Sequence, residues 1–253
     1  MHPVLVQIGG ISLYSWGFML AIAVIISTVG VRYYFVQEGL NPNIVLDIVL
    51  ITVICGIIGA RIAYILLYEW SAFLTDPWAV LTPFSGGISG MVWYGGLIAG
   101  FVAFAVILWL RDLPFWRVLD IFAPFVALSY AIARIGCFLS GCCYGKPTQS
   151  VLGVVFPYVD SLSRHPTQLY GTAVNLILFL FLVWFYPRRH FSGQIVILYL
   201  IGYAVYRFIL EFFRVNIIMY GPLSIGQVYS LLLLLVALWL YYWRNRQQRK
   251  FWF

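Results

Sequence analysis

The stretch IVLDIVLITVICGIIGARIAYILLY, residues 44–68, decides the fold class of this protein, because only Asp47 and Arg61 interrupt it with charge. A helix needs about 20 consecutive apolar residues to cross the hydrocarbon core of a bilayer. Six further runs of similar length and composition occur along the chain. The seven predicted spans cover residues 11–35, 44–68, 92–110, 118–139, 168–186, 194–213 and 225–243. We therefore predict an all-α, polytopic membrane protein with about seven transmembrane helices.

The composition excludes a water-soluble fold. Hydrophobic residues make up 63% of the chain and charged residues 9%, whereas roughly a quarter of the residues in a soluble domain are charged. No polar linker divides the 253 residues, so we predict a single domain covering residues 1–253. The net charge of +7 comes mostly from residues at the predicted helix ends. We interpret it as a topology signal and expect membrane lipid, not nucleic acid, as the partner.

The distribution of Lys and Arg predicts the orientation. With the N-terminus outside, the two outer positively charged residues are Lys146 and Arg164. The inner segments then carry nine, namely Arg32, Arg111, Arg117, Arg188, Arg189, Arg244, Arg246, Arg249 and Lys250. Because loops rich in Lys and Arg stay in the cytoplasm, we predict an outer N-terminus and a cytoplasmic C-terminus.

Charge inside the sixth predicted span is the first functional signal, because intramembrane charge is costly. The segment YRFILEFFR contains Arg207, Glu211 and Arg214 at i, i+4 and i+7, a spacing that places them on one helix face. Arg207 and Glu211 are candidate substrate-binding residues. The alternative interpretation is that they form a structural ion pair.

Three further arginines join this set. Arg61 lies inside the second predicted span, Arg134 near the outer end of the fourth, and Arg164 in an outer loop. An excess of guanidinium groups over carboxylates favours an anionic ligand, and a guanidinium group can bind two phosphate oxygens at once. The alternative for Arg134 and Arg214 is that their side chains reach the lipid headgroups.

Three cysteines form the pattern C-x4-CC at the outer end of the fourth predicted span. In an oxidising compartment, Cys137 could form a disulfide with Cys142 or Cys143. A metal site with His165 and a reactive thiol near Arg134 are the alternatives, but the spacing matches no standard zinc motif. We prefer a structural disulfide or inert thiols, and we predict no metal and no cofactor.

His165 and several glycines are the remaining candidates. His165 follows Arg164 and precedes a proline, and it is either a structural residue or an acid–base group. Gly95 and Gly96 either allow close helix packing or bring backbone amides near a phosphate. Gly145 is a candidate substrate-binding glycine in the loop that carries the cysteines.

Taken in order, these motifs make the chain similar to the prolipoprotein diacylglyceryl transferases, over most of its length. The matching stretches are SWGFMLAIA, GARIAYILLY, GGISG with YGGLIAG, ARIGCFLSGCCYG, RHPTQLY, EFFR and SIGQ. The resemblance implies lipoprotein biosynthesis in the bacterial cytoplasmic (inner) membrane. The diacylglyceryl group of phosphatidylglycerol would be transferred to the thiol of the lipobox cysteine in a preprolipoprotein, and glycerol phosphate would leave.

The resemblance also implies roles for individual residues. The signature arginine of the family falls on Arg134, and the arginine after its EFF run falls on Arg214. Arg134 and Arg214 would hold the phosphate and stabilise the leaving group. Tyr94 or His165 would assist the transfer of the thiol proton.

The chain departs from the usual family pattern at several polar positions. These are Trp16 in place of Tyr, Tyr94 in place of His, Cys137 and Ser140 in place of Asn, Cys142 in place of an acidic residue, and Gly171 in place of Glu. Two alternatives therefore stand beside the family reaction. One is a phospholipid-dependent transferase with another acceptor, and the other is a lipid-binding or lipid-moving membrane protein without catalysis.

Overall fold

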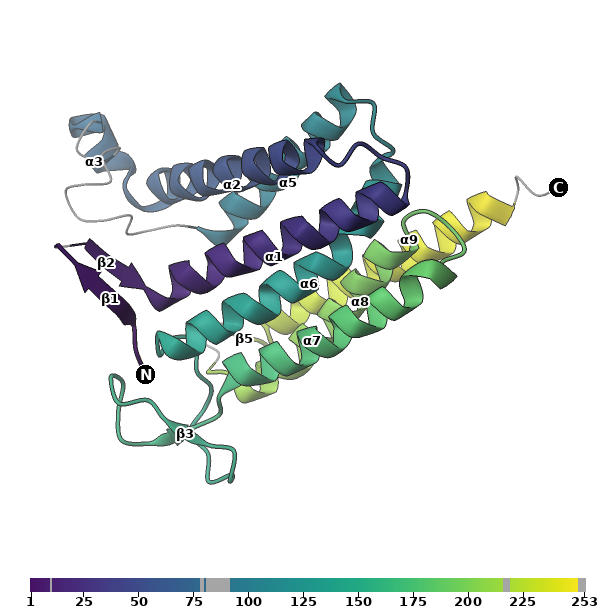
Figure 1. The fold of residues 1–253 in the computed structure, drawn as a ribbon. Coiled ribbons are helices and arrows are strands. Elements are labelled where there is room, and N and C mark those ends of the chain that lie inside the picture. Colours follow the sequence, from purple (N-terminus) through teal and green to yellow (C-terminus); the bar gives the residue numbers. More distant parts are fainter. Residues whose placement is uncertain (10, 78–79, 81–91, 216–218, 250–253) are drawn as a thin grey trace. The chain divides into compact units, whose positions relative to one another are not determined.

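The computed structural model describes residues 1–9, 11–77, 80, 92–215 and 219–249 (Figure 1). The GGISG motif at residues 86–90 lies outside the described residues.

Seven helices of the described part are long and apolar enough to cross a membrane, which confirms the predicted fold class. Each corresponds to one predicted apolar run. In chain order they are α1 (Ser15–Gln37), α2 (Ile44–Tyr68), α5 (Trp93–Leu110), α6 (Phe115–Leu139), α7 (Thr167–Phe185) with the 3-10 turn η1 (Tyr186–Arg188), α8 (Gln194–Leu210) with η2 (Glu211–Phe213), and α9 (Ile225–Arg249).

The first predicted span begins too early. Residues Ile11–Tyr14 form strand β2, which pairs antiparallel with β1 (Val4–Ile8), and the helix begins only at Ser15. The segment ISLY is apolar enough for a span, but it pairs its backbone groups with β1 instead of continuing the helix. Two shorter strand pairs lie between helices, namely β3 (Val154–Val155) with β4 (Ser163–Arg164) and β5 (Met219–Tyr220) with β6 (Leu223–Ser224).

The chain forms two compact units, and the prediction of a single domain remains a prediction. The smaller unit, Phe35–Phe115, contains α2, α5 and the short helix α3 (Trp70–Thr75). A Cβ added to Gly95 would lie 2.3 Å from the Cβ of Ala63 and 2.6 Å from the carbonyl oxygen of Gly59. The absence of side chains at Gly59 and Gly95 therefore lets α2 and α5 pack at backbone contact.

The larger unit, Met1–Tyr34 with Trp116–Phe253, contains α1, α6, α7, α8 and α9. Hydroxyl groups join α1 to α6 through Ser27 and Ser129 (2.7 Å), and Thr172 of α7 donates to the carbonyl of Ala131 in α6 (3.1 Å). Asp120 of α6 is fully buried and accepts from the amides of Gly193 and Val196, at the start of α8 (2.7 and 3.0 Å). A carboxylate in this position satisfies helix N–H groups that have no partner within α8.

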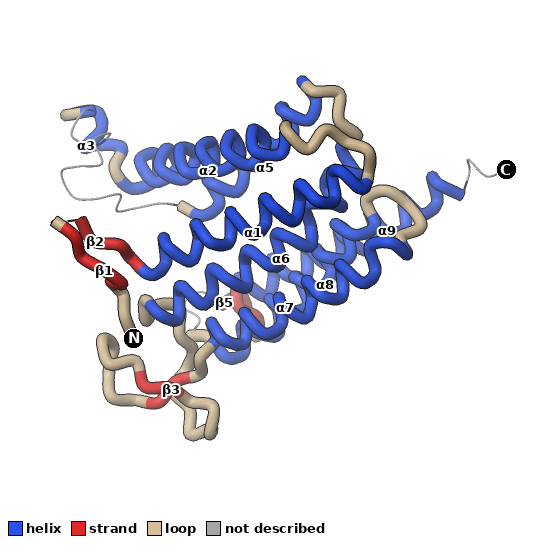
Figure 2. The backbone as a smooth tube through the Cα atoms, viewed as in Figure 1, coloured by secondary structure: helices blue, strands red, loops and turns tan. Residues whose placement is uncertain are grey.

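The short strand pairs β1–β2 and β3–β4 lie at the end of the larger unit where α1 and α7 begin and α6 ends (Figure 2). The predicted functional residues of this unit come from the same end. The helices thus hold a set of loops that the sequence marks as functional.

Candidate functional site

Three motifs that lie far apart in the sequence meet at this end of the larger unit. The amide of Gly145 donates to the carbonyl of His165 (2.9 Å), and the amide of Lys146 donates to the carbonyl of Phe213 (2.8 Å). The amide of His165 donates in turn to the carbonyl of Lys146 (3.0 Å). These bonds attach the GCCYG loop to the start of α7 and to the end of η2, so the loops that carry the candidate residues form one connected structure.

Gly145 has no room for a side chain in this structure. A Cβ at this position would lie 2.4 Å from the carbonyl oxygen of Phe213 and 2.8 Å from the Cβ of His165. The glycine therefore permits the close approach of the three segments. The predicted contact of Gly145 with substrate remains a prediction.

Arg134 lies in the last part of α6 within a group of aromatic side chains. Its Nη2 donates to the hydroxyl of Tyr130, and its Cζ lies 4.8 Å from the centre of the Tyr130 ring. The rings of Tyr130 and Tyr206 contact each other edge to face, with centroids 6.1 Å apart. A Cβ added to Gly171 would lie 2.5 Å from the hydroxyl of Tyr206 and 3.4 Å from the Cγ of Arg134. The tyrosines orient the guanidinium group without neutralising its charge.

Arg214 directly follows η2, where the backbone becomes extended. The charges of Arg214 and Arg134 both act on the Cys143 thiol. These two arginines, which are 80 positions apart in the numbering, are thus both near enough to Cys143 for their charges to act on its thiol.

Arg207 and Glu211 form an ion pair, with Nη2 of Arg207 2.5 Å from Oε1 of Glu211. Glu211 is buried, and its Oε2 accepts a hydrogen bond from the Ser224 hydroxyl (3.2 Å). The geometry matches the structural alternative of the sequence analysis. The predicted role of this pair in substrate binding remains untested.

The other two predicted arginines are paired as well. Arg164 donates through Nε and Nη2 to both carboxylate oxygens of Asp160, and through Nη1 to the carbonyl of Gly145 (3.4 Å). These hydrogen bonds lower the pKa of Asp160 and raise the pKa of Arg164. In the smaller unit, Nη2 of Arg61 lies 3.1 Å from a carboxylate oxygen of Glu69. In contrast, no carboxylate of the described residues forms an ion pair with Arg134 or Arg214.

His165 lies between two aromatic side chains. Its Nδ1 is 3.1 Å from the hydroxyl of Tyr170, and its ring packs edge-on against Phe213 at a centroid distance of 5.1 Å. Tyr170 can fix the orientation and tautomer of the imidazole, and Nε2 is the other ring nitrogen that could exchange a proton. The contact is compatible with an acid–base role, which remains a prediction.

Tyr94, Gly95 and Gly96 belong to the first turn of α5 in the smaller unit. Gly95 and Gly96 face α2, where a Cβ on Gly96 would lie 3.0 Å from the carbonyl oxygen of Gly56. Their surroundings fit the helix-packing interpretation. Their predicted contact with phosphate, and the proton-transfer role of Tyr94, remain predictions.

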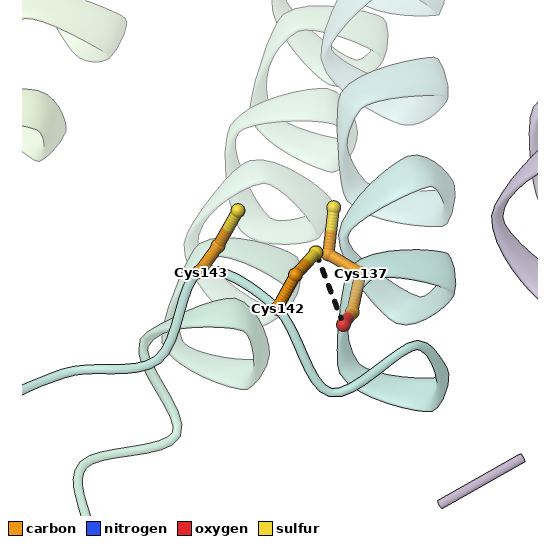
Figure 3. Close-up of side chains that lie close together, drawn as sticks. All are labelled: Cys137, Cys142 and Cys143. Atoms are coloured by element: carbon orange, nitrogen blue, oxygen red, sulfur yellow. Dashed lines mark hydrogen bonds between the residues drawn. The ribbon is translucent and has the colours of Figure 1, made fainter. Parts of the chain in front are cut away.

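Cys137, Cys142 and Cys143 are free thiols whose Sγ atoms all lie within 4.8 Å of one another (Figure 3). The thiol of Cys142 points to the carbonyl oxygen of Cys137 at 3.6 Å. The backbone of Cys143 has a φ of +63°, a value that residues with side chains seldom adopt. The three sulfur atoms are close together but are not bonded. The disulfide of Cys137 with Cys142 or Cys143 remains a prediction.

The three thiols differ in acidity. Hydrogen bonds with Cys137 and Cys142 lower the pKa of Cys143, and the charges of Arg134 and Arg214 act in the same direction. Hydrogen bonds with Cys137 and Cys143 raise the pKa of Cys142. Cys143 is thus the more acidic of these two thiols.

The tyrosines around Arg134 are not among the site residues predicted from the sequence. Tyr130 precedes Arg134 by four residues on the same helix, a spacing that places both side chains on one face. That signal was present in the sequence. Tyr206 comes from α8, and only the packing of α6 against neighbouring helices shows that it belongs here.

Comparison with known proteins gives a consistent result. The family profile described as prolipoprotein diacylglyceryl transferase matches residues 3–243. The chain is 33% identical over 256 residues to phosphatidylglycerol–prolipoprotein diacylglyceryl transferase 2 of Clostridium perfringens, an alignment that covers 99% of this chain and 98% of the relative. It is 34% identical to phosphatidylglycerol–prolipoprotein diacylglyceryl transferase of Synechocystis sp., with 94% and 89% covered.

Proposed function

This chain belongs to the prolipoprotein diacylglyceryl transferase family, and we propose that Arg134 and Arg214 hold the lipid phosphate during the reaction of that family. The protein is a transferase of the bacterial inner membrane and acts in lipoprotein biosynthesis. Its substrates are phosphatidylglycerol and a preprolipoprotein with a lipobox cysteine. The names of the relatives do not favour the alternatives of another acceptor or of lipid binding without catalysis.

The reaction requires one bond to form and one to break. The sulfur of the lipobox cysteine attacks the glycerol carbon that carries the phosphate, and a carbon–sulfur bond forms. The bond between that carbon and the phosphate oxygen breaks, and its electron pair leaves with glycerol phosphate. The thiol proton is lost as the sulfur attacks. Negative charge therefore develops on the phosphate oxygen as it leaves, and positively charged donors placed there lower the barrier.

The observation that carries this proposal is that Arg134 and Arg214 have no ion-pair partner among the carboxylates of the described residues. Arg164 and Arg207 in the same unit already contact carboxylates, so their charges are largely compensated within the protein. Arg134 and Arg214 form no ion pair with a described carboxylate, and both act on Cys143. Two guanidinium groups that act on the same thiol and form no ion pair with a described carboxylate favour an anionic ligand over a purely structural role.

His165 is our candidate for the group that accepts the thiol proton, with Tyr94 as the second candidate. The imidazole of His165 is held by Tyr170 and is attached through the backbone to the loop that contains Gly145. A histidine can accept a proton near neutral pH.

The test uses purified protein, phosphatidylglycerol and a peptide with a lipobox cysteine, and measures the thioether product by mass spectrometry. We expect Arg134→Gln and Arg214→Gln each to lower kcat by about 10²–10³-fold, the effect of removing one transition-state donor. Lys at either position should restore only part of the activity, because a point charge lacks the forked geometry. The matched control is Arg246→Gln, an exposed arginine of α9 that should retain activity. If both Gln variants stayed near wild-type activity, the phosphate role would be wrong.

A further inference from the structure

The cluster formed by Cys137, Cys142 and Cys143 contains three thiols, one more than a disulfide uses. Cys137 belongs to the last turns of α6, whereas Cys142 and Cys143 belong to the loop that follows (Figure 3). A metal ion needs several ligand atoms of His, Cys, Asp or Glu side chains close together. Among the described residues, Cys137, Cys142 and Cys143 form the group of at least three such side chains that meets this condition. A bridge between any two of these cysteines would leave the third unused.

The distances fit a soft metal ion. Zinc binds thiolate sulfur at about 2.3 Å, which places sulfur ligands of a tetrahedral ion about 3.8 Å apart. The Sγ atoms lie within 4.8 Å of one another, so changes in side-chain torsion of modest size would close the site. Cys142 and Cys143 are exposed and Cys137 is half-buried, which leaves one side of the sulfur group accessible.

The backbone that carries the thiols is held from outside the loop. The Thr167 hydroxyl donates to the carbonyl of Cys143 (2.7 Å), and the amide group of Gln168 donates to the carbonyl of Cys142 (2.5 Å). Thr167 and Gln168 are both buried at the start of α7. The uncommon φ of Cys143 is thus maintained by fixed contacts, as expected where a side chain must face a particular point.

We propose that Cys137, Cys142 and Cys143 bind one zinc ion as thiolates, and that its open fourth position takes the thiol of the lipobox cysteine. This inference rests on the proposed function, and it goes beyond the sequence analysis, which predicted no metal. Catalytic zinc sites commonly combine three protein ligands with a position for water or substrate. Thiolate ligands favour zinc over hard ions such as magnesium and calcium.

The bound ion would assist the thiol in the reaction already described. A thiol loses its proton when it coordinates zinc, and the proton passes to water or to a nearby base. The coordinated sulfur then forms the carbon–sulfur bond while the carbon–oxygen bond breaks, and the thioether leaves the ion because it is a weaker ligand.

The experiment first measures metal in the full-length protein, purified in mild detergent and passed over a chelating resin. We expect about one zinc ion per chain. Cys137→Ser, Cys142→Ser and Cys143→Ser should each reduce the zinc content to less than about a tenth of wild type. The matched control is Cys55→Ser in α2, outside the larger unit, which should retain its zinc. Size-exclusion profiles establish that each variant remains folded. A chain without zinc, one that holds only copper, or one whose intact mass is two protons low from a disulfide would overturn the proposal.

Cobalt substitution and pH then test the fourth position. The cobalt-loaded protein should show sulfur-to-cobalt absorption that changes when a lipobox peptide is added, and the same peptide with Ser in place of Cys should cause no change. Without zinc, the Cys143→Ser variant should regain part of its activity as the pH rises towards about 8.5, where the substrate thiol ionises by itself. An unchanged spectrum or an unchanged pH profile would overturn the role of the ion in catalysis. If the chain bound no zinc but Arg134→Gln and Arg214→Gln still lowered kcat as expected, the zinc proposal would be wrong and the proposed function would stand. If the chain bound zinc but both Gln variants stayed active, only the phosphate role of the two arginines would be contradicted.

Discussion

The ion pair between Arg207 and Glu211 predicts a marked asymmetry between two single substitutions. Glu211 is 3% exposed, whereas the side chain of Arg207 is 24% exposed. Arg207→Gln therefore removes the guanidinium group that lies 2.5 Å from this buried carboxylate. Glu211→Gln leaves a partly exposed guanidinium group, which can still donate to the new amide oxygen.

The structure sets the size of the two effects. Removing one partner of a buried pair costs about 3–5 kcal/mol, and the low exposure of Glu211 places Arg207→Gln in this range. The hydroxyl of Ser224 still donates to the carboxylate at 3.2 Å, so we expect the lower part, about 3 kcal/mol. Glu211→Gln loses charge attraction but keeps hydrogen bonds, which corresponds to about 1–2 kcal/mol. The double variant should be less destabilised than the sum of the two single variants.

The assay is unfolding of the purified protein in mild detergent, followed by helical signal during titration with a denaturing detergent. The free energy of unfolding of each variant is compared with wild type and with Arg246→Gln, an exposed control. The kcat of the protein that remains folded should fall far less than in the Arg134→Gln variant. If Arg207→Gln were as stable as wild type, or if its folded fraction were as inactive as Arg134→Gln, the pair would not be structural.

The remaining predictions concern topology and the loops. A C-terminal reporter that is active only in the cytoplasm should be active, because the inner segments carry more Lys and Arg, and an inactive reporter whose fusion is inserted would reverse the orientation. Gly145→Ala should lower the midpoint of thermal unfolding or the activity, because its Cβ would lie 2.4 Å from a carbonyl oxygen, and a variant equal to wild type in both measurements would contradict the close approach. Arg164 lowers the pKa of Asp160, so this contact is present above the unfolded pKa of about 3.9 and is lost only as the pH falls through the lower folded value. Limited proteolysis of the β3–β4 region should therefore be constant from pH 7 to about 5, and faster throughout in Asp160→Asn.

The helical architecture could be predicted from the sequence because lipid imposes a single strong rule, which is that every backbone polar group must be paired within the span. Apolar length alone then identifies the helices. The rule does not apply at the membrane surface, where Ile11–Tyr14 pair with a neighbouring strand instead of extending α1. Asp120 shows the same limit, because a single acid in an apolar run could be a proton carrier or a cap. Only the structure shows its hydrogen bonds to Gly193 and Val196.

The candidate site shows why counting charges was not enough. In the sequence, Arg134, Arg164, Arg207 and Arg214 form one set of basic residues near a single glutamate. In the structure, Arg164 and Arg207 each bind a carboxylate of their own helix turn or loop. Arg134 and Arg214 form no such pair with a carboxylate of the described residues, and the charges of both act on the Cys143 thiol. Both paired carboxylates lie four residues from their arginine, so the spacing could suggest these two pairs. The sequence could not show that no carboxylate of another described segment forms an ion pair with Arg134 or Arg214. We propose that this difference in pairing, and not the number of arginines, separates the arginines that stabilise the fold from those that bind the lipid phosphate.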